Sequence, residues 1–212
     1  LASSVEVLPD GEAAIRGRHV VALGNMMDSA FMRNLYFRAY DLTDLAWPGP
    51  GGWAIRTIPR SLGGVGHVIA ASVSRAEDAP EAAEALAGIL GDRGAVLPYQ
   101  HRGELGRWAD LFLGPARETL AKGDEDLERE FTAGPGDWTY MWAIADIGVL
   151  AVQTGMEELA RMFCRQVRHF CRTRWFERRL PDPPQIHGFL RTMLLPFTML
   201  EHLPGLPPDE RE

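Results

Sequence analysis

The fold prediction depends most on residues 138–172, which read WTYMWAIADIGVLAVQTGMEELARMFCRQVRHFCR. From 138 to 153 the residues are apolar on nearly every side of a helix, which is typical of a buried helix. After Thr154-Gly155-Met156-Glu157, apolar residues recur every three or four positions with arginines between them. That spacing predicts an amphipathic helix, and the Thr-x-x-Glu pattern is a capping box that marks its start. We therefore predict a helical hairpin here.

The same helical patterns extend outward from this hairpin in both directions, with breaks at Gly and Pro residues. Helices are predicted over residues 66–75, 78–90, 104–122, 124–131, 138–153, 156–177 and 185–203. Short helices joined by short breaks are typical of helical hairpins packed in series. The predicted fold class is mainly α, with serial helical hairpins around one core.

The N-terminal part of the chain has a different pattern. Val5–Leu8, the turn Pro9-Asp10-Gly11-Glu12 and Ala13–Leu23 predict a short β-hairpin. A helix follows, with Asp28 or Ser29 as its N-cap, and the break Trp47–Trp53 precedes a short strand at 54–58. The predicted domains are 1–60 (hairpin, helix and Gly/Pro-rich loop), 61–205 (helical hairpins, continuous with the first part) and 206–212 (disordered tail).

Composition excludes several classes of protein. The chain has 212 residues, 46% of them hydrophobic and 24% charged, as in ordinary globular proteins. Its net charge of −7 argues against a protein that coats nucleic acid. Cys164 and Cys171 lie about 10 Å apart along one helix, too far for a disulfide, and we predict that both are reduced and buried. No stretch suits a membrane span, so we predict a cytoplasmic location and no membrane partner.

Arginine is concentrated in one segment. Residues 161–179 contain seven arginines and one glutamate, a charge of +6 that leaves −13 for the rest of the chain. Arg161, Arg165, Arg168 and Arg172 are spaced to form one stripe on a helix. Guanidinium groups suit planar recognition of carboxylate or phosphate. The stripe could anchor a small anion or an acidic protein surface, or it could be a solvated face partly neutralised by the acidic run 124–128.

Asp146 is the only ionisable acid in the apolar helix 138–153. Thr139, Trp142 and Gln153 share its side of the helix. A buried carboxylate must be paired, or its pKa must rise, which makes Asp146 a candidate acid/base; the alternative is that this side is a narrow solvated edge. His101, in the predicted loop 98–102, is the second catalytic candidate. The predicted substrate-binding residues are Arg60, Arg161, Arg165, Arg168, Arg172, Trp142 and Gln153.

No spacing of histidine and cysteine suits a metal site, and no nucleotide-binding or nucleophile motif is present. The sequence therefore does not indicate a cofactor. The leading hypothesis is a small-molecule enzyme, with Asp146 in a pocket between helices and arginines anchoring an anionic substrate. The alternative is a non-enzymatic interaction protein whose arginine-rich helix docks an acidic partner. The sequence is also compatible with a homodimer. An enzyme requires Asp146 and the arginines to face one cavity, whereas an interaction protein requires them to point outward and apart.

Overall fold

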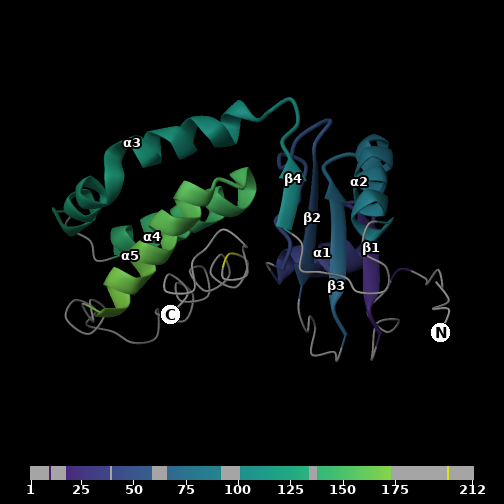
Figure 1. Cartoon of the computed structure of the whole chain (residues 1–212), viewed down its shortest axis with the longest axis horizontal. Helices are drawn as coiled ribbons and strands as arrows, with labels where there is room; N and C mark the ends of the chain where they lie inside the picture. Colours follow the sequence, from purple (N-terminus) through teal and green to yellow (C-terminus); the bar gives the residue numbers. More distant parts are fainter. Residues whose placement is uncertain are drawn as a thin grey trace. The chain divides into compact units, whose positions relative to one another are not determined.

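The computed structural model describes residues 10, 18–38, 40–58, 66–91, 101–133, 138–172 and 200, with the backbone alone at 101, 128, 130–133 and 138–141. The chain divides into two compact units, Leu1–Trp108 and Ala109–Glu212. We call them the sheet unit and the helical unit (Figure 1). Of the predicted domain bounds, 60/61 and the tail 206–212 lie outside the described residues, as do 173–199 of the predicted C-terminal helices.

The sheet unit contains one four-stranded sheet in its described part, in the order β1-β3-β2-β4. β1 is parallel to β3, whereas β2 is antiparallel to both β3 and β4. The elements of this unit are β1 (Val20–Gly24), α1 (Ala30–Phe37), β2 (Trp53–Ile58), β3 (Val68–Val73), the 3₁₀ turn η3 (Ala76–Asp78), α2 (Ala79–Gly91) and β4 (His101–Glu104).

The two faces of the sheet carry separate apolar clusters. Phe31, Met32 and Leu35 of α1 pack on one face, and Leu86 of α2 packs on the other. All six residues of β3 are buried because the strand is central and covered on both faces. A strand in that position reads as a continuous apolar run rather than an alternating one.

The prediction of a mainly α fold is wrong, because the structure is α+β with a mixed sheet. The predicted helix 66–75 is β3, since periodicity does not distinguish a short apolar run in a buried strand from one in a helix. The predicted loop at His101 and the start of the predicted helix at Glu104 form β4. The predicted N-terminal hairpin lies largely outside the described residues, which exclude 1–9 and 11–17; its described part, β1, pairs in parallel with β3.

The break Trp47–Trp53 is a packed part of the sheet unit. Trp47 is only 3% exposed, and the peptide bond to Pro48 is cis. The backbone N–H groups of Gly106 and Arg107 donate to the carbonyls of Pro48 and Pro50, both at 2.9 Å. A Cβ at Gly106 would lie 2.2 Å from the Pro50 carbonyl oxygen. Only glycine lets the two backbones cross this closely.

The helical unit contains α3 (Asp110–Ala133), α4 (Trp138–Thr154) and α5 (Glu157–Arg172). α4 contacts both α3 and α5, as its apolar composition predicts. Gly123 interrupts α3 with a φ of +73°, at the position where the sequence predicted two helices rather than one. Gly155 joins α4 to α5 with a φ of +66°, a conformation that glycine adopts readily at helix ends.

Candidate functional site

α5 separates apolar from basic side chains, as its sequence predicts. The buried side chains of the helix are Leu159, Ala160, Met162, Phe163, Cys164, Gln166 and Phe170. Arg165 and Arg172 are exposed, and Arg161 and Arg168 are half-buried. We call these four arginines the arginine face. Burial of the apolar residues fixes the rotation of α5 about its axis, and this orientation places the arginines.

Arg165 binds a carboxylate from the kink in α3. Its Nε donates to Oδ2 of Asp124 at 2.8 Å, and its Nη2 forms an ion pair with the same oxygen at 2.7 Å. The neighbouring Gln166 donates from Nε2 to the other oxygen, Oδ1, at 3.0 Å. Both oxygens of Asp124 are therefore held by two consecutive residues of α5. The prediction that the acidic run 124–128 partly neutralises the stripe is confirmed at Asp124.

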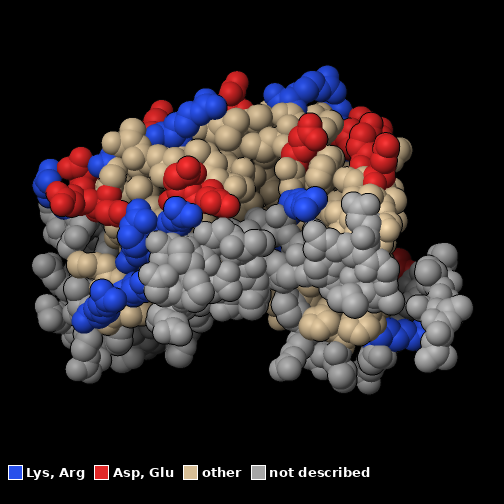
Figure 2. Space-filling model, viewed as in Figure 1, with Lys and Arg blue, Asp and Glu red and all other residues tan. Residues whose placement is uncertain are grey.

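Arg161 also pairs within the helical unit, with its Nη2 3.7 Å from Oε2 of Glu157 one turn earlier. In the same unit, Arg129 pairs with Asp126 at 2.8 Å. Figure 2 accordingly shows basic and acidic side chains beside one another over the described part of the helical unit in this view. The first half of the arginine face is thus partly compensated by carboxylates of the chain itself.

The C-terminal half of α5 has a different charge balance. Glu157 and Glu158 are the only acidic residues of α5, and both lie in its first turn. From 159 to 172 the helix carries four arginines and no acid. Arg172 and His169 lie in the last turn, where positive charge also interacts favourably with the helix dipole. After its first two residues, the described part of α5 therefore carries basic side chains and no acidic ones.

The candidate residues of α4 do share one side of their helix. Trp142 is 49% exposed, Asp146 is exposed and Gln153 is half-buried. The opposite side is buried through Ile144, Ala145, Ile147, Ala151 and Val152. The expectation that α4 is buried all round is wrong. The apolar residues Trp142, Val149 and Leu150 on its more open side made that side look like core.

Asp146 lies on this open side of α4. Desolvation by its surroundings nevertheless raises the pKa of its carboxyl group above the ordinary value of 3.8. The ion pairs found for Arg161 and Arg165 are made with Glu157 and Asp124. Neither of these two ion pairs includes Asp146. A carboxyl group of raised pKa can hold a proton at higher pH than an ordinary aspartate.

The side chains of the remaining candidates, His101 and Arg60, lie outside the description. His101 lies in β4 of the sheet unit, where its backbone is in register with Arg56, and its side chain is outside the description. Arg60 is also outside the described residues. Both cysteines are free, but only Cys164 is buried, so the prediction that Cys171 is buried is wrong. Cys171 lies near the end of α5, beyond the last buried residue Phe170.

Sequence reasoning missed a buried polar cluster in the sheet unit. Asp41 is 2% exposed. Its Oδ2 accepts from the Ser72 hydroxyl at 2.8 Å, and its Oδ1 accepts from the Thr43 hydroxyl at 3.0 Å. The cluster joins the segment after α1 to the end of β3. The Asp-x-Thr spacing favours a local turn and was the available signal, but only the fold shows the partner on β3.

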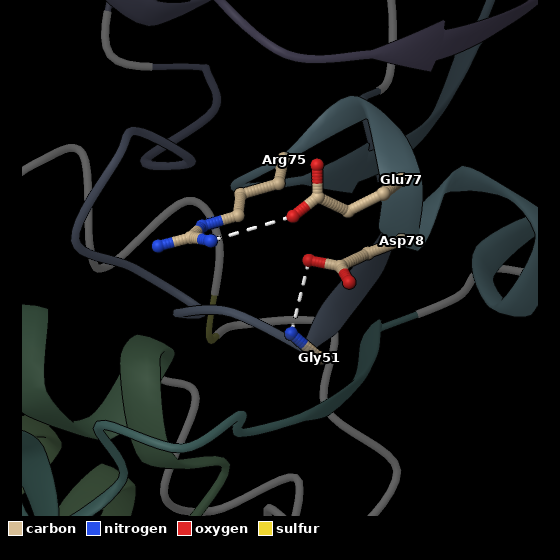
Figure 3. Close-up of polar contacts among 4 residues, drawn as sticks. All are labelled: Gly51, Arg75, Glu77 and Asp78. Carbon is tan, nitrogen blue, oxygen red and sulfur yellow. Dashed lines mark hydrogen bonds and ion pairs between the residues drawn. The ribbon is translucent and has the colours of Figure 1, made fainter.

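Further contacts hold the loop 47–52 beside the end of β3. The Gly49 N–H donates to the buried Ser74 hydroxyl at 2.9 Å. Figure 3 shows the Gly51 N–H donating to Asp78 at 2.9 Å, next to the ion pair of Arg75 with Glu77 at 3.3 Å. These contacts explain why a loop rich in Gly and Pro is fixed. Their geometry serves to anchor the loop.

The N-terminus of α1 is capped twice. Ser29 is the N-cap, as predicted, and accepts from the Met32 N–H at 3.1 Å. Asp10 accepts from the Phe31 N–H at 2.9 Å and the Ser29 hydroxyl at 3.0 Å, and also from the Ala30 N–H. Desolvation, the largest influence, would raise the pKa of Asp10. These hydrogen bonds and the charge of Arg33 together outweigh it and hold the pKa below 3.8.

No group of three or more metal-ligating side chains occurs among the described residues. None of the helices that the structure describes could cross a membrane.

Compared with known proteins, the chain matches no family model, no curated protein and no solved structure. The functional argument therefore depends on the arginine face and on α4.

Proposed function

We propose that the protein is a non-enzymatic binding protein whose arginine face docks an acidic partner, such as an acidic segment of another protein. One observation carries the proposal: Arg165 and Gln166 bind both oxygens of a carboxylate on this face. That arrangement demonstrates which chemical group these side chains accommodate. The four arginines between residues 159 and 172, with no acid among them, provide positive charge for additional carboxylates.

The local charge matters more than the net charge for such docking. The whole chain is negative, so at long range it repels an acidic partner. At 0.15 M salt, charges further apart than about 8 Å are largely screened. Contacts at the arginine face then decide the affinity, and they select carboxylates presented close together.

The test uses a fluorescently labelled oligoglutamate peptide and measures fluorescence anisotropy at two salt concentrations. Replacing Arg168 and Arg172 together with Gln should weaken binding about tenfold, since an exposed ion pair contributes up to about 1 kcal/mol. A control in which Arg107 and Arg117, both exposed, are replaced with Gln has the same charge change outside α5. Equal weakening by the two double variants would contradict a specific arginine face, and so would tighter binding of an equally charged DNA oligomer.

The raised pKa of Asp146 favours a second candidate, the small-molecule enzyme. Catalytic acids are enriched among groups with displaced pKa values. This candidate requires an anionic substrate to contact Asp146 and the arginines together. Titration with succinate, followed by amide NMR shifts, distinguishes the two: an enzyme site predicts shifts at Asp146 and Arg161 together, whereas the binding protein predicts shifts along α5 alone.

A further inference from the structure

We propose that Asp124 is an internal competitor, which occupies the arginine face until a carboxylate of the acidic partner replaces it. This inference rests on the proposed function and concerns the regulation of the same site. It follows from the geometry of Asp124, from its exposure and from its place in α3.

The geometry is that of a complete receptor for one carboxylate. Arg165 contacts Oδ2 through a hydrogen bond from Nε and an ion pair at Nη2, and Gln166 donates to Oδ1. Gln166 is only 4% exposed, so packing limits the positions that its amide can take. A carboxylate from another chain would find the same donors in the same positions. Asp124 and the partner therefore compete for them.

The contact is also open to exchange. The side chains of Arg165 and Asp124 are 46% and 36% exposed, and an exposed ion pair contributes little free energy to the fold. Asp124 directly follows Gly123, where the positive φ ends the first helical segment of α3. Its carboxylate is thus presented from the start of a separate segment. Rotation of the Asp124 side chain suffices to release Arg165.

Release of Arg165 would extend the available surface. Arg165, Arg168 and Arg172 lie at successive turns of α5, so together they span two turns of positive charge. The partner binds only those molecules in which Asp124 has released Arg165, so its apparent affinity is reduced in proportion to that fraction of molecules. Removal of the Asp124 charge should therefore tighten binding without adding any contact.

The experiment measures binding of the labelled oligoglutamate peptide to the intact chain and to two matched variants. Asp124→Asn removes the competitor, whereas Asp126→Asn removes the same charge from a carboxylate that pairs within α3. Asp124→Asn should bind the peptide about two- to fivefold tighter, the range that corresponds to an exposed ion pair. Asp126→Asn should change the affinity by less than about twofold, because it alters only the screened background charge.

Adding Arg165→Gln to Asp124→Asn should abolish the gain. Circular dichroism verifies the fold of each variant, and Asp124→Ser serves as a second variant if Asp124→Asn unfolds. If the intact chain binds the peptide but neither Asp124 variant binds it more tightly than Asp126→Asn, the internal competitor is overturned and the proposed function stands. If no variant binds the peptide at all, both are overturned.

Discussion

Asp41 in the sheet unit and Asp124 in the helical unit make similar contacts in different surroundings. Each carboxylate accepts hydrogen bonds at both oxygens: Asp41 from the nearby Thr43 and the distant Ser72, and Asp124 from two residues of α5. Asp41 is 2% exposed, whereas the side chain of Asp124 is 36% exposed. Removal of the buried group would leave donors without water or a partner, but water can replace the exposed one. The same chemistry thus stabilises the fold in one unit and is exchangeable in the other.

The largest effect is expected where burial is greatest. Asp41→Ala removes the acceptor of the Ser72 and Thr43 hydroxyls and should lower the free energy of unfolding by about 3 kcal/mol. Urea denaturation measures the change. Asp28→Ala is the control, because Asp28 accepts from Asn25 at 2.8 Å but is exposed. Equal losses in the two variants would show that burial does not separate these contacts.

Glycine positions extend the comparison to the backbone. Gly106→Ala should destabilise the protein by at least about 2 kcal/mol, the scale of backbone strain and overpacking, because its Cβ would overlap the Pro50 carbonyl oxygen. Gly88, in α2, has no atom within 4 Å of its Cβ position. Gly88→Ala should instead stabilise by about 0.5–1 kcal/mol. Thermal unfolding of the two variants should therefore shift in opposite directions.

Asp10 provides an exposed contact within the sheet unit. Asp10→Ala should cost about 1 kcal/mol at neutral pH, as for other helix caps. Because folding lowers the pKa of Asp10, its carboxylate stabilises the protein at pH values above the ordinary pKa of 3.8. This contribution is lost as the pH falls through the folded-state pKa. The difference between the two proteins in urea denaturation should thus disappear in acid, and a constant difference would refute the capping role.

The smallest effect on stability is expected at Arg165. Arg165→Gln breaks the exposed pair with Asp124 and should lower the free energy of unfolding by less than about 1 kcal/mol. The loss should shrink further in 1 M NaCl, where the Debye length is about 3 Å. A loss as large as that of Asp41→Ala would mean that Asp124 is a structural tie and would count against its exchange with a partner.

The helical unit was more predictable from sequence than the sheet unit, for a physical reason. α4 and α5 follow from spacings within each helix. Gly123 marks the break in α3, and Gly155 marks the break between α4 and α5. β3 has no such local signature, because burial on both faces removes the alternation of an ordinary strand. Partial neutralisation of the arginines by the acidic run 124–128 was one of the alternatives that the sequence offered, but the Asp124–Arg165 pair and the part of Gln166 in it depend on how the helices pack. In the Asp41 cluster, the contact with Thr43 is local, but the contact with Ser72 depends on long-range pairing.

The order of the strands also bears on how the chain folds. β2 and β3 are neighbours in the sequence and pair directly, so their ladder closes a short loop. β1 pairs with β3 in parallel, with Val20 opposite Val68. This pairing closes a long loop that contains α1 and β2. Contacts between such distant residues slow folding, because the entropy of closing the intervening loop is lost before the contacts form. The β2–β3 ladder should therefore nucleate the sheet, and the amide hydrogens of β1 and β4, which both pair with strands distant in the sequence, should gain protection later during refolding.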